Sequence, residues 1–127
     1  ADNEIRGAPM IQVRGSMWRD AMGLVEMFDI HDMSVIASVA RAIVSDAKKY
    51  KSYAKIIKMD KYSKELVDVI NLMLAIAKDS ADNDRPLDFQ KLVNSTNPIE
   101  KLAGEALKRS LEAKEYYMKH LSRRYNK

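Results

Sequence analysis

The sequence predicts an all-α protein, an antiparallel four-helix bundle built as one domain over residues 1–127. Three observations support this prediction. Apolar residues recur at spacings of three and four in four long segments, which is the pattern of amphipathic helices. The chain contains only 4 Gly and 3 Pro, and they cluster near the boundaries of those segments. No segment with the alternating pattern of a strand competes with them.

Composition narrows the class of protein. Hydrophobic residues make up 46% and charged residues 31%, which is typical of a folded protein and argues against disorder. The formal net charge of +4 favours acidic partners or anionic surfaces. No apolar run approaches the roughly 20 residues of a membrane span. Because the chain has no cysteine, disulfides, thiolate catalysis, iron–sulfur clusters and covalent haem attachment are excluded.

A first helix is predicted from Met10 to Asp29, after a polar lead-in segment over residues 1–9. Gly15 and Gly23 each cost about 1 kcal/mol inside a helix relative to alanine, so we expect them to mark close packing. The apolar face of this helix is formed by Met10, Val13, Met17, Ala21, Leu24 and Phe28.

Two further helices are predicted at about Ser34–Ile57 and Lys61–Asp79, the first capped by Asp32 or Ser34 and the second by Asp60. Lysines gather in the second half of the first of these, where cations complement the negative end of a helix: Lys48, Lys49, Lys51, Lys55 and Lys58. Its apolar face is Ile36, Val39, Ala40, Ile43, Val44, Ala47 and Ala54. The face of the following helix is Leu66, Val69, Ile70, Met73, Leu74 and Ala77.

A longer connection over residues 80–97, with a short helical turn at Asp88–Val93, leads to the longest predicted helix, Pro98–Tyr125. Asn97 is its expected cap, and a proline suits the first helical position because its missing N–H is unpaired there in any case. His120 lies on the edge of an apolar face formed by Ile99, Leu102, Ala103, Ala106, Leu107, Ala113, Tyr117 and Leu121.

His120 is the strongest candidate for a functional side chain. An inward imidazole in a helical bundle can ligate haem iron or another metal, with a second ligand from a facing helix. Met17 is the best-placed partner because it lies centrally on the first apolar face and its thioether is a soft axial ligand. The alternative is an interfacial histidine packed at the edge of the core, which is a common environment for histidine.

Two other clusters indicate chemistry more weakly. Asp29, His31 and Asp32 are metal-capable residue types, but they fall in a predicted turn, so a capped loop is favoured over a metal site. Aromatic and basic residues occur together between Tyr116 and Tyr125, as they do on protein surfaces that bind nucleic acid. However, several of these rings fall on the core side, and cations are expected at a helix C-terminus in any case. We therefore expect no nucleic-acid partner. We also expect no enzymatic activity, since no catalytic triad or phosphate-binding glycine loop is visible.

Two short motifs resemble a known family. The segment Ile11-x-x-Arg14-x-x-Met17, followed by a helix rich in Ala, Val and Ile, is similar to the opening of the cytochrome c-prime family. The ending, with His120 and Arg124 four residues later, resembles both that family and its non-covalent haem-b relatives. The resemblance implies a small periplasmic four-helix bundle that holds haem between a methionine of the first helix and a histidine of the last.

Carried over to this sequence, the resemblance implies Met17 and His120 as the haem and metal ligands and Arg14 near the haem propionates, with Arg124 in the same cofactor-binding set. The attachment cysteines of the cytochromes are replaced by Tyr116 and Lys119. An alternative alignment of the ending to the haem-b relatives puts Tyr117, rather than His120, at the ligand position. That register implies a bundle of the same fold without haem.

The leading hypothesis is therefore an exported, periplasmic four-helix bundle that binds b-type haem and carries electrons to a redox partner protein, or binds a small ligand. A chain that begins Ala1-Asp2 fits a mature form from which a signal peptide has been removed. The alternative hypothesis is a cofactor-free bundle that acts as an accessory or dimerising protein, for example as a homodimer. A third hypothesis, metal handling through methionines and His31, ranks below both.

Overall fold

The computed structural model describes residues 16–125, with side chains from Arg19 to Leu121. All the regular structure of this part is helical, which confirms the predicted all-α class. Three long helices are joined by short ones and by single 3-10 turns at Ala47–Lys49 and Met59–Lys61. The long helices are α4 (Ile30–Ser45), α6 (Lys64–Asn83) and α8 (Pro98–Tyr125), and the short ones are α3 (Ser16–Ala21), α5 (Tyr50–Ile56) and α7 (Gln90–Val93).

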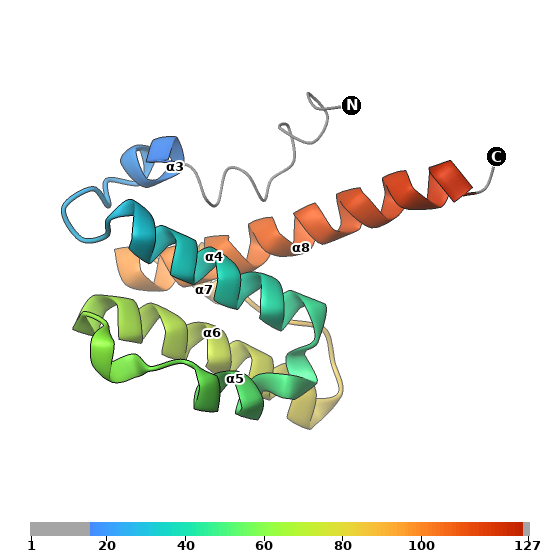
Figure 1. Cartoon of the computed structure of the whole chain (residues 1–127), viewed down its shortest axis with the longest axis horizontal. Helices are drawn as coiled ribbons and strands as arrows, with labels where there is room; N and C mark the ends of the chain where they lie inside the picture. Colours follow the sequence, from blue (N-terminus) through green and yellow to red (C-terminus); the bar gives the residue numbers. More distant parts are fainter. Residues whose placement is uncertain (1–15, 126–127) are drawn as a thin grey trace.

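The three long helices run in the same direction (Figure 1). His31, at the start of α4, and Tyr62, just before α6, line one hollow, so these helices begin side by side. They also end side by side, because the Tyr50 hydroxyl, just past α4, donates to the Asp82 carboxylate near the end of α6 at 3.3 Å. The long helices are therefore not antiparallel as predicted. Helix α5 and residues 84–97 return the chain between them.

The core lies between α4, α6 and α8. All six predicted apolar residues of α6 are buried, which confirms that face. Leu24 and Phe28 close the core from the segment between α3 and α4. Ala54, predicted as core, is exposed on α5. The buried residues of α4 are Met33, Ile36, Ala37, Val39, Ala40, Ile43 and Val44, and those of α8 include Leu102, Ala103, Ala106, Leu107 and Ala113.

The predicted first helix does not continue to Asp29. Its described part ends at Ala21, because Gly23 adopts a positive φ of 70° and reverses the chain. The N–H of Leu24 donates to the Arg19 carbonyl and that of Gly23 to the Asp20 carbonyl, both at 3.0 Å. This pair of bonds is a Schellman motif, in which glycine is favoured because it has no Cβ. Gly23 thus ends a helix and does not mark close packing within one.

The predicted second helix is divided into α4 and α5. Asp46 is extended, with φ −157° and ψ 93°, and its carboxylate accepts from the Lys48 N–H at 3.1 Å. The Tyr53 hydroxyl lies 3.1 Å from the carbonyl oxygen of Ala42 and 3.0 Å from that of Asp46, so its hydrogen is shared between them. From α8, the Nζ of Lys114 donates to a further carbonyl near the end of α4 at 3.1 Å. Lys114 thus pairs the Val44 carbonyl, whose donor in a continuing helix, the Lys48 N–H, is bound to the Asp46 carboxylate instead. Tyr53 adds a second donor to two carbonyls that already accept from backbone N–H groups.

Two of the predicted caps are wrong and one is confirmed. Asp29 caps α4, and Asp32, which was predicted as a cap, is its capping-box partner: each carboxylate accepts from the other residue's N–H. Ser63, rather than Asp60, caps α6 through the Leu66 N–H. Asn97 caps α8 as predicted, accepting from the next two available N–H groups at 2.9 and 3.3 Å. The predicted short turn near Val93 is α7.

Gly104 lets α7 and α8 approach closely. A Cβ placed on Gly104 would lie 2.6 Å from the backbone nitrogen of Val93 and 2.7 Å from the Cβ of Leu92. Real Cβ atoms essentially never come that close to other heavy atoms. Gly104 lies inside a regular helix, so its backbone conformation does not call for glycine. Glycine is required here because there is no space for a side chain.

Replacing Gly104 with alanine tests this contact. Helix propensity alone predicts that the substitution raises the free energy of unfolding by about 1 kcal/mol. We expect instead a decrease of about 1–3 kcal/mol, because the methyl group forces α7 away from α8. Urea denaturation measures the difference, with exposed Lys101→Ala on the same helix as the control. A stabilised Gly104→Ala variant contradicts the close approach.

Replacing Tyr53 with phenylalanine tests the α4–α5 junction. Loss of the shared hydrogen bond should lower the free energy of unfolding by about 1 kcal/mol at neutral pH. Burial, and secondarily the Asp46 carboxylate, raises the pKa of Tyr53 above its ordinary 10.0. The native state thus holds the phenolic proton more tightly, so this contribution is complete below pH 10.0 and is lost as pH rises through the raised pKa. Denaturation curves should therefore show the parent protein to be more stable than Tyr53→Phe at neutral pH. The difference in the free energy of unfolding should shrink as the pH is raised above 10.0.

Candidate functional site

The C-terminal half of α8 extends past the ends of α4 and α6 (Figure 1). The described buried residues of α8 end at Ala113. Beyond it, Tyr117 is half-buried, Met118 is 60% exposed and Leu121 is 47% exposed. Spacings of one and four residues place these three side chains on one side of the helix. We call Tyr117, Met118 and Leu121 the distal face of α8.

The distal face borders a hollow of about 240 Å³ between α8 and the end of α4. Ser110 is 1% exposed on the hollow's α8 wall, and its hydroxyl has no hydrogen-bond partner among the described residues. The ammonium group of Lys114 on the wall of the hollow donates a hydrogen bond to the Val44 carbonyl oxygen. The hollow is lined by Arg41, Val44, Ser45, Ser110, Lys114, Tyr117 and Met118.

His120 lies near this face but outside the core. Its ring packs on that of Tyr116, one turn earlier, with centroids 4.2 Å apart and planes inclined by 51°. Tyr116 in turn contacts Tyr117 edge-to-face at 5.7 Å. The imidazole is half-buried, and it belongs to the part of α8 beyond the last buried residue. The contact found for the imidazole is with its own helix, and both alternatives for His120 stay predictions.

The remaining residues of the predicted haem site are only partly described. Arg14 lies outside the described residues, and Met17 and Arg124 are described only by their helical backbones. Haem held between helices needs a ligand enclosed by apolar walls. The half-buried ring of His120, stacked on a tyrosine of its own helix, does not fit that requirement. Haem ligation by Met17 and His120 therefore stays a prediction, and we derive no chemistry through haem.

The acidic cluster at the start of α4 forms a helix cap. The carboxylates of Asp29 and Asp32 are both engaged by backbone N–H groups, and His31 beside them is exposed. Within the described residues, no group of three His, Asp or Glu side chains is arranged to hold a metal ion. The sequence favoured a capped loop here, whereas in the structure Asp29 is the helix cap and His31 and Asp32 lie in the first turn of α4.

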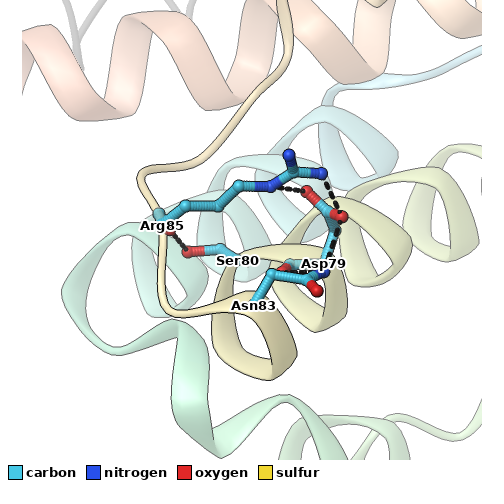
Figure 2. A network of polar contacts seen from close by, with 4 residues as sticks. All are labelled: Asp79, Ser80, Asn83 and Arg85. Atoms are coloured by element: carbon cyan, nitrogen blue, oxygen red, sulfur yellow. Dashed lines mark hydrogen bonds and ion pairs between the residues drawn. The ribbon is translucent and has the colours of Figure 1, made fainter.

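A polar cluster at the end of α6 was not predicted (Figure 2). The guanidinium of Arg85 binds both carboxylate oxygens of Asp79, with Nε 3.0 Å and Nη2 2.6 Å from its partners. Asn83 donates to the same carboxylate at 3.1 Å, and the Ser80 hydroxyl donates to the Arg85 carbonyl. Asp84, in the left-handed conformation with φ 48°, reverses the chain so that Arg85 can reach back. The cluster ends a helix and leaves its charges paired.

Comparison with known protein families, curated proteins and solved structures finds no match to this chain. The resemblance to cytochrome c-prime therefore stays a prediction. Among the described helices, none is long and apolar enough to cross a membrane. The site must be interpreted from its own residues, and its chief property is apolar surface beside a hollow.

Replacing Arg85 with glutamine tests the cluster at the end of α6. Hydrogen bonds from Arg85 are the largest cause of a lowered pKa for Asp79, whose ordinary value is 3.8. We expect the Asp79 pKa to rise toward that value in Arg85→Gln, measured by NMR titration of the carboxyl carbon. The exposed neighbouring substitution Lys78→Gln should leave it unchanged. A carboxyl group with a lowered pKa stabilises the native state at every pH above the pKa of the unfolded chain. The parent protein should therefore lose the stability that comes from Asp79 only as the pH falls below 3.8.

Proposed function

We propose that this protein is a cofactor-free helical interaction protein that forms a homodimer through the distal face of α8. One observation carries the proposal: the apolar side of α8 is buried as far as Ala113 and then continues as an exposed surface. An apolar surface that prolongs a core-facing stripe is typical of an interaction site.

The exposed end of α8 gains from being covered. Full burial of a side chain such as Met118 or Leu121 contributes about 1.5–3 kcal/mol. An isolated helical segment of a few turns is only marginally stable in water, so the distal part of α8 also gains from tertiary contacts. A partner along this face supplies both contributions.

The geometry of the distal face favours a second copy of this chain as the partner. Along the helix, Tyr117 lies four residues, or about 6 Å, before Leu121 and three residues after Lys114, which lines the hollow. A two-fold axis at Tyr117 therefore places Leu121 of each copy against the hollow of the other. Such an interface is isologous, because the same surface serves both copies.

The charges of the face permit this contact. Between Ala113 and the distal face the charged residues are Lys114, whose Nζ is bound to the Val44 carbonyl oxygen, and the exposed Glu115. Two copies with a net charge of +4 each repel one another overall, so an interface free of unpaired like charges is needed. The hollow of about 240 Å³ offers room for an aliphatic side chain.

Sedimentation velocity over a range of concentrations tests the proposal. We expect the parent protein to dimerise, and the double variant Met118→Glu/Leu121→Glu to be monomeric, because each carboxylate would be buried unpaired at the interface. Ile30→Glu is the matched control, since Ile30 is a similarly exposed (58%) apolar residue on α4. That control should dimerise like the parent protein.

Two results contradict the proposal. A parent protein that is monomeric at every concentration, with a lower melting temperature in Leu121→Glu, would mean that the chain covers this face itself. A dimer that persists in the double variant would place the interface elsewhere. Added hemin provides a separate check: a Soret band that shifts on reduction and disappears in His120→Ala would support the haem hypothesis instead.

A further inference from the structure

We propose that a second surface of this protein, centred on α5, binds anionic lipid membranes. This lysine surface consists of the exposed side chain of Ile56 and seven lysines: Lys48, Lys49, Lys51, Lys55, Lys58, Lys61 and Lys64. It is separate from the distal face of α8 and does not depend on the proposed dimer.

The lysine surface holds the positive charge of the whole chain. Between residues 48 and 64 the sequence contains seven lysines and a single acidic residue, Asp60. That excess of six positive charges is larger than the +4 of the full sequence, so the rest of the chain is slightly acidic. All seven lysines are exposed, and none takes part in the ion pairs found between described residues, which join Arg19 to Asp20, Arg85 to Asp79 and Arg109 to Glu105.

The packing of α5 turns the lysines outward. Tyr50 and Tyr53 pack against the core, and their hydroxyls are bound to Asp82 and to carbonyls at the end of α4. Lys51 and Lys55 are four residues apart and therefore share the opposite side of the helix. Ile56 follows directly and is 74% exposed. An exposed apolar side chain at the end of a lysine-bearing helix can enter the boundary of a membrane while the lysines contact its head groups.

A hollow of about 490 Å³ opens beside Ile56, between the start of α4 and the 3-10 turn before α6. Lys58 and Lys61 lie on its wall, and Ser34 and Ser38 add hydroxyl donors from α4. Ammonium and hydroxyl groups are the donors that a lipid phosphate accepts. The hollow thus provides space for a head group next to the side chain that would enter the acyl layer.

The same surface fits nucleic acid less well. Single-stranded nucleic acid binds by stacking bases on free aromatic rings, but Tyr50 and Tyr53 are packed against the core. The cations between residues 48 and 64 are all lysine, without the arginine that reads phosphate or guanine bidentately. An exposed isoleucine makes no contact that phosphate recognition needs, whereas it can be buried at the boundary between the head groups and acyl chains of a bilayer.

Vesicle co-sedimentation tests the proposal with the full chain. We expect binding to phosphatidylcholine vesicles that contain roughly one third phosphatidylserine, and none to phosphatidylcholine alone, because the attraction is to anionic head groups. Binding should weaken as salt is raised. Lys51→Gln/Lys55→Gln should reduce the affinity at least about tenfold, since each lysine near an anionic surface adds to the attraction. Ile56→Ser should also reduce it, with the salt dependence unchanged.

Matched controls separate this surface from the net charge. Lys91→Gln/Lys101→Gln removes two exposed lysines of α7 and α8, outside the lysine surface, and Val25→Ser removes an exposed valine from the segment between α3 and α4. Both controls should bind like the parent protein, and circular dichroism verifies that every variant is folded. Equal loss in the lysine control and in Lys51→Gln/Lys55→Gln overturns the proposal. So does tight binding of a labelled oligonucleotide by a protein that ignores anionic vesicles.

Discussion

The burial of the first half of α8 against α4, α6 and α7 is the contact on which the rest of the structure depends. Small residues make it close: Ala103 and Ala106 are fully buried, and Gly104 leaves no room for a methyl group below α7. Close packing of this kind is sensitive to single methyl groups. Because α7 is held there, the connection that follows α6 must return across the molecule, and α8 starts beside the start of α6.

The end of α4 links the core to the protein surface. Asp46 leaves the helical conformation, Lys114 pairs the Val44 carbonyl that loses its helical donor, and the Tyr53 hydroxyl binds the carbonyls of Ala42 and Asp46. Because of this break, α5 folds back along α6 and presents Lys51 and Lys55 to solvent. A continuous helix would have carried those lysines away from the body of the protein. A local choice of backbone conformation thus determines where the positive charge is displayed.

The sequence predicted the helical class, the face of α6 and the start of α8 at Asn97, because these depend on periodicity and on local capping. It did not predict the break at Asp46, since the donors beside it come from Tyr53 and from Lys114, which lies 70 residues from its acceptor Val44. The glycine that ends α3 was visible but was interpreted as a packing residue. Helical periodicity predicted on which side of α8 His120 lies. The exposure of the His120 side chain depends instead on where the neighbouring helices α4 and α6 end, which periodicity does not show.

The common direction of α4, α6 and α8 also has an electrical consequence. Peptide dipoles add along a helix, so three helices with the same direction give the protein a permanent dipole along its length. Its positive end is where α4 and α6 begin, beside Lys58 and Lys61. A charged surface exerts a torque on such a molecule from a distance, before any side chain touches it. The helix dipoles therefore add to the attraction between an anionic surface and the end of the lysine surface that carries Lys58 and Lys61.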